Sequence, residues 1–347
     1  MHARGITSRL AWSTGIAGAG FAAKAALTAW CDRRGVDPQL RSPLLPMVSV
    51  PYTAATLPIW RMMFQVPRWS GPGVRVRTRF FGEANIRVRV TTPAGEARRR
   101  PLVIWLHSGG MIAGSPQFEG PMAGILARRV DAVVVAPDYR LAPQHSFPAA
   151  LDDCVGTVKW AIAHADQLGI DPNRIALAGA SAGGGLAATC AQRCRDEGIE
   201  IRSLALLYPM LDNRPVQSPL CAGVAWNGTS NQFAWDSYLG NNAGDCPPYS
   251  VASRRDDLTA APPTLIAVGD IDILCAQSTE YANRLRECGI PCELRVVPGM
   301  YHAADILVPW SRKMRRLHAD VTEHLRGHLS APARLSSESP CRHRRRR

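Results

Sequence analysis

Continuous apolar runs of about five residues recur from residue 74 onward, and segments with a helical pattern separate them. Residues 102–106 and 132–136 are such runs. A strand covered by helices on both faces is apolar at every position, whereas a half-exposed strand alternates. The pattern therefore predicts a mostly parallel sheet between two helical layers. Further strands are expected at 174–180, 204–208, 264–268 and 294–297, and helices at 147–165, 182–195, 278–288 and 304–325.

Three segments depart from this rhythm. Residues 74–80 and 86–90 alternate apolar side chains with basic ones, which predicts early edge strands with one face in water. Residues 213–250 are rich in Asn, Gly, Pro and aromatic side chains and show no clear strand. An insertion of this kind, lying over the carboxyl edge of a sheet, would serve as a lid or a pocket wall.

The chain has a formal net charge of +13 and ten cysteines. Most of the excess charge lies at the two ends: residues 1–35 carry five basic and one acidic side chain, and residues 331–347 carry six and one. A nucleic-acid groove needs its charge on the folded body, so no nucleic-acid partner is predicted. The cysteines form no C-x-x-C pair and have no His at finger spacing, which favours reduced structural thiols and no metal site.

The amino terminus allows several interpretations. Residues 10–31 are mostly small and apolar behind a basic start, as in a secretory signal. Lys24 interrupts this run, and the glycines within the run would weaken a membrane-spanning helix. The sequence favours a retained helix, either in a cap or in peripheral contact with a membrane, and a cytoplasmic location; export stays open. The basic segment 331–347 is predicted to be a disordered tail.

The strongest local motif is Gly179-Ala-Ser-Ala-Gly183, at the junction of an expected strand and an expected helix. A nucleophilic serine sits on such a sharp turn, where its neighbours must lack bulk so that strand and helix can approach. The turn would raise the hydroxyl of Ser181 above the sheet, with the amino terminus of the next helix directed at developing negative charge. The alternative is a plain strand-to-helix turn.

A second motif, His107-Ser-Gly-Gly110, follows the expected strand 102–106. A glycine pair after a buried strand leaves backbone N–H groups free to point at a ligand oxygen. Together with the amide of Ala182, which follows the serine, such groups form an oxyanion hole. His107 itself is interpreted as a structural histidine that holds its own loop.

A nucleophilic serine also needs a base and an acid that orients the base, in the order Ser, Asp, His. His302 follows the last expected strand, in a glycine-containing loop, and His145 is the other candidate base. Asp270 and Asp272 both follow the strand at 264–268, so either could be the acid. Asp272 and His302 lie at the carboxyl ends of strands, the same edge as Ser181, where ligands bind in open α/β sheets.

Five motifs together resemble the bacterial hormone-sensitive-lipase family over roughly residues 75–325. They are His107-Ser-Gly-Gly110, the segment from Asp138-Tyr-Arg-Leu-Ala-Pro143 to Asp153, Gly179-Ala-Ser-Ala-Gly-Gly184, Asp272-Ile-Leu274 and Pro298-Gly-Met-Tyr-His302. The resemblance implies an α/β-hydrolase fold with a helical cap. It also implies that Ser181, Asp272 and His302 form a catalytic triad. The backbone amides of Gly109, Gly110 and Ala182 would form the oxyanion hole.

The resemblance also implies the domain plan. We expect a cap segment at 1–73, a catalytic domain at 74–330 with a cap insertion at about 211–250, and the tail at 331–347. This chain departs from the family pattern at four places. Ser108 stands at the first glycine of the usual His-Gly-Gly-Gly, Ala180 and Gln144 replace common acidic residues, and Cys275-Ala-Gln277 replaces an acidic pair.

The predicted function is hydrolysis of short-to-medium acyl esters of small molecules through an acyl-serine intermediate, without metal or organic cofactor. Aromatic cap residues could bound the substrate, although such residues more often pack in the core; they include Trp226, Phe233, Trp235 and Tyr238. An amidase or N-deacetylase with the same triad, and a non-catalytic small-molecule-binding relative, remain alternatives. Whether the chain forms a homodimer stays open.

Overall fold

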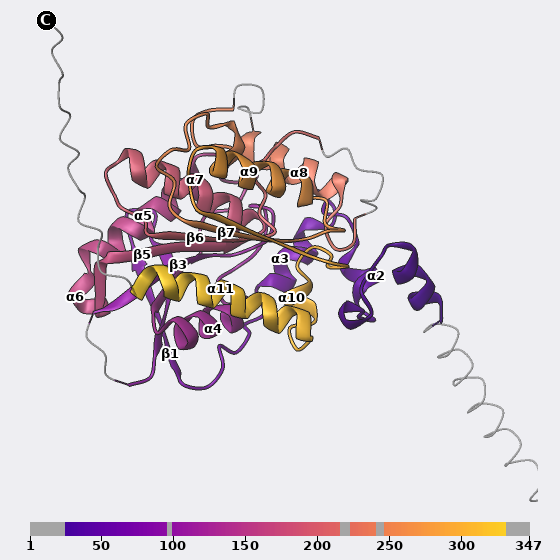
Figure 1. Cartoon of the computed structure of the whole chain (residues 1–347), viewed down its shortest axis with the longest axis horizontal. Coiled ribbons are helices and arrows are strands. Elements are labelled where there is room, and N and C mark those ends of the chain that lie inside the picture. The colour runs from indigo at the N-terminus through magenta and orange to yellow at the C-terminus, as the bar shows by residue number, and fades with distance from the viewer. Residues whose placement is uncertain (1–24, 96–98, 216–222, 241–245, 331–347) are drawn as a thin grey trace, which may run out of the picture.

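The centre of the computed structural model is an eight-stranded sheet in the order β1-β2-β4-β3-β5-β6-β7-β8 (Figure 1). The structure describes residues 25–95, 99–215, 223–240 and 246–330. Strands β1 and β2 pair antiparallel, as do β2 and β4, and all other pairs are parallel, as predicted. The strands are β1 (Val74–Phe81), β2 (Ile86–Pro93), β3 (Arg100–Leu106), β4 (Val133–Pro137), β5 (Ile170–Ala180), β6 (Ser203–Leu207), β7 (Thr264–Gly269) and β8 (Cys292–Val297).

Helices cover both faces of this sheet (Figure 1). One layer contains α5 (Ala149–Ala163), α7 (Ala182–Asp196), α8 (Gly228–Leu239) and α9 (Cys275–Glu287), and the other contains α4 (Gly120–Val130) and α11 (Arg312–Ser330). Leu102 and Ile104 of β3 enter the first core, whereas Val103 and Trp105 enter the second. Because successive side chains of a strand point to opposite faces, two cores require an uninterrupted apolar run.

The structure corrects two expectations about individual elements and locates a helix in the cap insertion. Strand β1 forms an edge of the sheet, but β2 does not, because it lies between β1 and β4. Six of the eight residues of β1 are exposed, so both faces of β1 meet solvent rather than one. The helix expected at 304–325 is divided into α10 (Ala304–Leu307) and α11, because Pro309 lies between them and cannot donate a helical hydrogen bond. The insertion at 213–250 contains α8, whose first turn is capped by the Asn227 side chain.

Segments near the amino terminus pack beside the carboxyl edge of the sheet. Residues 25–33 are helical, and η1 (Pro38–Leu40), α2 (Leu45–Val48) and α3 (Leu57–Phe64) follow. Arg61 of α3 donates to the carbonyl oxygens of Ile112 and Ala142 at 2.8 and 2.7 Å, and to Gln144 Oε1 at 2.7 Å. These bonds join α3 to the loops that follow β3 and β4.

Several predictions fall outside the described residues: most of the 10–31 segment, the 331–347 tail, and parts of the insertion at 216–222 and 241–245. Within the described ranges, no helix combines the length and the apolar character that crossing a membrane requires.

Short elements complete the fold: α6 (Ala165–Leu168) follows α5, and η3 (Ala252–Arg254) precedes β7.

Candidate active site

Ser181 lies on the sharp turn between β5 and α7, with φ 55° and ψ −120°. This left-handed backbone is costly for a residue with a side chain, and it marks a functional position more often than a structural one. The glycines two residues away are required by close approach. A Cβ on Gly183 would lie 2.0 Å from the Leu106 carbonyl oxygen, and one on Gly179 would lie 2.3 Å from the Gly183 oxygen. The motif thus folds as a turn that raises Ser181 at the carboxyl edge.

A chain of two hydrogen bonds connects Ser181 to an acid. Ser181 Oγ lies 2.8 Å from His302 Nε2, and His302 Nδ1 lies 2.8 Å from Asp272 Oδ2. All three residues are buried. Asp272 Oδ1 also accepts the Leu274 N–H at 2.9 Å, which fixes the carboxylate. The loops after β5, β7 and β8 therefore bring a hydroxyl, an imidazole and a carboxylate into one line.

The two alternative candidates lie elsewhere. Asp270 Oδ1 accepts the Gly299 N–H at 2.7 Å, so this side chain ties the loop after β7 to the turn after β8. It is exposed, whereas Asp272 is buried against His302. His145 is exposed in the loop between β4 and α5. The structure brings neither of them into the chain that begins at Ser181.

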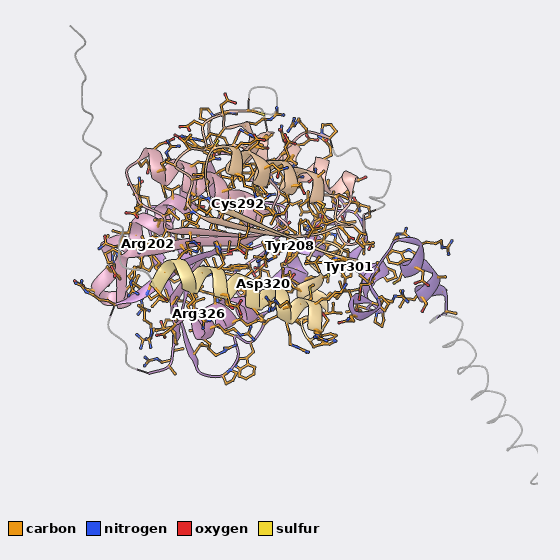
Figure 2. The ribbon with its side chains drawn as sticks, viewed as in Figure 1. Arg202, Tyr208, Cys292, Tyr301, Asp320 and Arg326 are labelled. Carbon is orange, nitrogen blue, oxygen red and sulfur yellow. The ribbon has the colours of Figure 1, made fainter. Side chains whose placement is uncertain are left out.

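Two aromatic rings hold His302 in place. The Trp226 ring stacks on it at 5.7 Å, and the Tyr208 ring meets it edge-on at 4.9 Å. Tyr208 in turn donates its hydroxyl to Asp305 Oδ1 at 2.6 Å. Figure 2 shows Tyr208 and Tyr301 near the same end of the sheet. The sequence offered no signal for the role of Tyr208, because the contact joins separate loops.

The loop after β3 presents free backbone donors. Gly109 and Gly110 have φ values of 119° and 65°, and both line the same cavity as Ser181 and His302. In the described part of the chain, no acceptor faces the N–H groups of Gly109, Gly110 or Ala182. Ala182 is the first residue of α7, where helical N–H groups lack partners. Three donors thus remain available to a ligand oxygen.

Sequence reasoning missed the residue that anchors this loop. Glu119 Oε1 accepts both the N–H and the hydroxyl of Ser108, the former at 2.7 Å, and Glu119 Oε2 accepts Trp105 Nε1–H at 2.7 Å. Burial raises the pKa of Glu119 to about 7, against the opposing effect of these three bonds. Ser108, the departure from the usual glycine, therefore connects the loop to a buried carboxyl at the start of α4.

His107 holds its own loop, as its interpretation as a structural residue predicts. Its Nδ1 lies 2.8 Å from the Ser108 carbonyl oxygen, and its ring stacks on Tyr139 with centroids 4.0 Å apart. The Tyr139 hydroxyl donates to the His107 carbonyl oxygen at 2.8 Å. Burial lowers the pKa of His107 to about 4, so the imidazole is neutral near pH 7.

A cavity of about 120 Å³ lies against Ser181, His302, Gly109 and Gly110. Of the four aromatic residues expected to bound it, only Trp226 lines it; Trp235 and Tyr238 are buried in the core, and Phe233 packs against that core. The other aromatic walls come from the amino-terminal segments and from the loops after β3 and β8: Tyr52, Trp60, Phe64, Phe118 and Tyr301. Among the residues that the structure describes, no cluster of His, Cys, Asp or Glu could hold a metal ion.

Comparison with known proteins supports the same fold. A family model described as alpha/beta hydrolase fold matches residues 103–306. The chain belongs to this family. Among curated relatives of this α/β-hydrolase, carboxylesterase NlhH of Mycobacterium tuberculosis is 32% identical over 284 residues, which cover 78% of this chain and 89% of the relative. Esterase LipU of the same organism is 30% identical over 250 residues, 69% of this chain and 82% of the relative.

Solved structures agree. Esterase LipW from Mycobacterium marinum superimposes on this α/β-hydrolase with a TM-score of 0.78 and 32% identity, covering 86% of this chain and 98% of that one. A bacterial heroin esterase has a TM-score of 0.77 and 31% identity, with 86% and 99% covered. The predicted family of bacterial, hormone-sensitive-lipase-like α/β-hydrolases, which are carboxylic ester hydrolases, is confirmed.

Proposed function

We propose that this α/β-hydrolase is a serine carboxylesterase that cleaves short-to-medium acyl esters of small molecules. The observation that carries the proposal is the chain from Ser181 Oγ through His302 to Asp272, with both distances at 2.8 Å. A nucleophile, a base and an orienting acid in this order are the requirement for acyl transfer. The names of relatives, among them carboxylesterase NlhH and ethyl acetate hydrolase of Pseudomonas putida, support ester substrates.

The first half of the reaction forms the acyl-enzyme. His302 Nε2 takes the Ser181 proton as Oγ attacks the ester carbonyl carbon, and Asp272 holds Nδ1–H and stabilises the imidazolium. The N–H groups of Gly109, Gly110 and Ala182 donate to the oxyanion. One such donor contributes about 3 kcal/mol to transition-state stabilisation. The C–O bond to the alcohol then breaks, and the alcohol leaves with the proton from Nε2.

The second half restores the enzyme. A water molecule attacks the acyl carbon while His302 Nε2 accepts its proton, and the same three N–H groups stabilise the second oxyanion. The Ser181–acyl bond breaks, Oγ regains the proton from Nε2, and the carboxylic acid leaves. Neither half needs a metal or an organic cofactor.

The cavity walls favour a neutral, apolar acyl group. Aromatic and aliphatic side chains line the cavity, and no Lys, Arg, Asp or Glu of the described chain is among them. A charged acyl group would lose its hydration there without gaining a partner. The volume of about 120 Å³ favours short chains over long ones.

Activity on a series of p-nitrophenyl acyl esters, from acetyl to dodecanoyl, tests this proposal, with the matching p-nitroanilides to detect an amidase. We expect the short esters to turn over fastest and the anilides to turn over far more slowly. Wild-type enzyme quenched in acid during turnover should carry an acyl adduct that peptide mass spectrometry assigns to Ser181. Anilide hydrolysis at the ester rate would identify an amidase, and no turnover of either series would identify a binding protein.

A further inference from the structure

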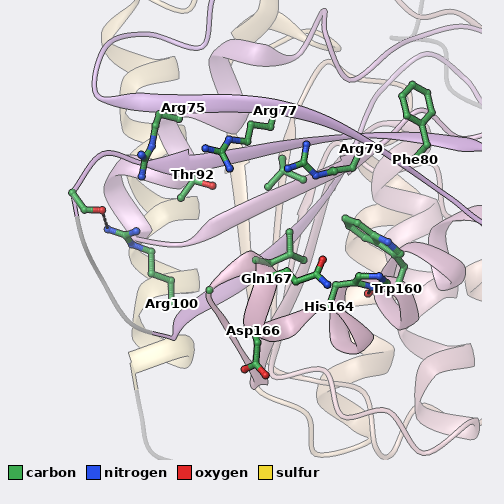
Figure 3. A pocket seen from close by; sticks show the side chains of 14 residues that line it. Arg75, Arg77, Arg79, Phe80, Thr92, Arg100, Trp160, His164, Asp166 and Gln167 are labelled. Carbon is green, nitrogen blue, oxygen red and sulfur yellow. Dashed lines mark hydrogen bonds between the residues drawn. The ribbon is translucent and has the colours of Figure 1, made fainter.

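A second, larger concavity lies on the opposite edge of the sheet. This groove, of about 750 Å³, runs between β1 and the end of α5 with α6 (Figure 3). Arg75, Arg77 and Arg79 form a row on β1, and Arg100 lies at one end. Arg100 and Gly169 mark the amino ends of β3 and β5. Ser181, by contrast, follows the carboxyl end of β5, so the groove is separate from the active site.

The three arginines of β1 carry uncompensated charge. They are exposed, and no acidic side chain in the described ranges pairs with any of them. Across the strand pair, Arg75 and Arg77 face Thr92 and Val90, which are neutral. Residues two apart on a strand have Cα atoms about 7 Å apart, so three like charges repel one another here.

Charge on an edge strand also discourages pairing with another sheet edge. That role requires charged side chains, but it does not require a wall opposite them. Here the wall includes Trp160, His164 and Gln167, and the acidic Asp166 points away from the arginines (Figure 3). The combination of a cationic row and a facing wall indicates a binding groove rather than a solvated edge.

The wall limits what the groove can bind. The Trp160 ring already packs against two other rings, with centroid distances of 5.7 Å to Phe81 and 5.2 Å to His164. A nucleobase could stack on Trp160 only by displacing one of these rings, and the exposed Phe80 ring points away from this wall (Figure 3). Stacking is the usual source of affinity for single-stranded nucleic acid. A flat bilayer would meet the exposed arginines but could not enter between them and the facing wall, whereas a narrow soluble ligand could contact both.

We propose that the groove binds an elongated, soluble polyanion that carries at least two linked phosphate groups. Arginine pairs with phosphate oxygens through two parallel N–H donors, and its side chain is long enough to converge on neighbouring phosphates. Binding would neutralise the repulsion along β1 and would tie β1 to α6. The proposal does not depend on the reaction at Ser181.

Isothermal titration of the full chain with sodium tripolyphosphate tests this site. The groove variant is Arg75→Gln/Arg77→Gln/Arg79→Gln. A matched variant, Arg312→Gln/Arg315→Gln/Arg326→Gln, removes the same charge from the exposed face of α11, where Figure 2 shows Arg326. We expect one tripolyphosphate to bind per chain. The affinity should be about tenfold or more weaker in the groove variant and nearly unchanged in the α11 variant. Tripolyphosphate should also raise the Tm of the wild type and of the α11 variant, but not that of the groove variant.

Other outcomes would overturn the proposal. Equal weakening in both variants would show a general charge effect, and orthophosphate binding as tightly as tripolyphosphate would show a single-phosphate site. Sedimentation with phosphatidylglycerol vesicles, lost only in the groove variant and without tripolyphosphate binding, would assign the arginines to a membrane. Both variants should keep the wild-type esterase rate, which shows that each is folded.

Discussion

The cavity beside Ser181 and the arginine groove lie at opposite edges of one sheet and differ in size, lining and charge. The cavity holds about 120 Å³, is lined by apolar and aromatic side chains, and contains one aligned chain of polar groups. The groove holds about 750 Å³ and is lined by exposed arginines. The smaller site has the arrangement that chemistry needs, so volume is a poor guide to where a reaction occurs.

Burial explains the difference. At the carboxyl edge, Ser181, Asp272 and His302 are buried away from water. Hydrogen bonds and charge interactions are stronger in this buried environment than in water. At the groove, the guanidinium groups of Arg75, Arg77 and Arg79 remain exposed, and dissolved salt screens them. We therefore expect substitutions in the cavity to change ester turnover greatly and substitutions in the groove to change it very little.

The largest effect is expected for Ser181→Ala. Without Oγ there is no nucleophile, and a comparable triad loses about 10⁶-fold in kcat when its serine is removed. The variant should remain folded, because alanine is smaller than serine and keeps the same backbone. Turnover of p-nitrophenyl acetate measures the loss. More than a tenth of wild-type activity in the variant would refute the nucleophile assignment.

The next effect separates two neighbouring carboxylates. Asp272→Asn should lower kcat by about 10⁴-fold, because an amide stabilises the wrong tautomer of His302. Asp270→Asn is the matched control and should change kcat by no more than a few-fold, since an Asn oxygen can still accept the Gly299 N–H. If parallel assays gave the reverse ranking, the orienting acid would be Asp270.

Glu119 should make stability depend on pH. Its pKa in the folded chain is about 7, above its ordinary value of 4.5, because burial disfavours the charged carboxylate. Between those values the folded state holds the proton more tightly than the unfolded state, so the free energy of unfolding falls as pH rises. Relative to Glu119→Gln, the wild type should lose on the order of 3 kcal/mol from pH 4.5 to 7. Urea unfolding at several pH values tests this, and parallel profiles would contradict it.

The same residue should affect catalysis more modestly. Glu119→Gln places an amide nitrogen beside either Ser108 or Trp105, so one of the bonds that hold the loop after β3 is lost. We expect kcat to fall about tenfold, with KM nearly unchanged, since the loop acts on the transition state. Ser108→Gly, which removes the hydroxyl bond and keeps the N–H bond, should have a smaller effect. A change confined to KM would place the role of Glu119 in substrate binding instead.

The smallest effect is expected at the groove. Removing the charge of Arg75, Arg77 and Arg79 should leave kcat/KM for p-nitrophenyl acetate within about twofold, because exposed charges far from the site are screened. Saturating tripolyphosphate should also leave the wild-type rate unchanged. A tenfold change in either measurement would show that the two edges of the sheet are coupled.

The family and the sheet could be predicted from local pattern. Uninterrupted apolar runs indicated strands between two helical layers, because a strand that enters two cores has no position for a charge. The G-x-S-x-G turn and the loops after 264–268 and 294–297 follow strands whose carboxyl ends must meet at one edge. The candidate nucleophile, base and acid were therefore placed near one another before any contact was known. The break at Pro309 was missed although proline is itself a local signal. Helix α8 was not located within the cap insertion, because residues distant in sequence decide how that segment packs.

The sequence by itself determined the alternation of strand and helix, the turn at Ser181 and the order of the candidate residues, since all three depend on neighbours along the chain. Tertiary structure alone decided which aspartate meets His302, that Glu119 anchors Ser108, and that Tyr208 and Trp226 hold the imidazole. It also decided that the arginines of β1 face a wall. The physical reason is range: Ser181 and His302 are 121 positions apart, and only packing of the whole sheet sets the distance between their side chains.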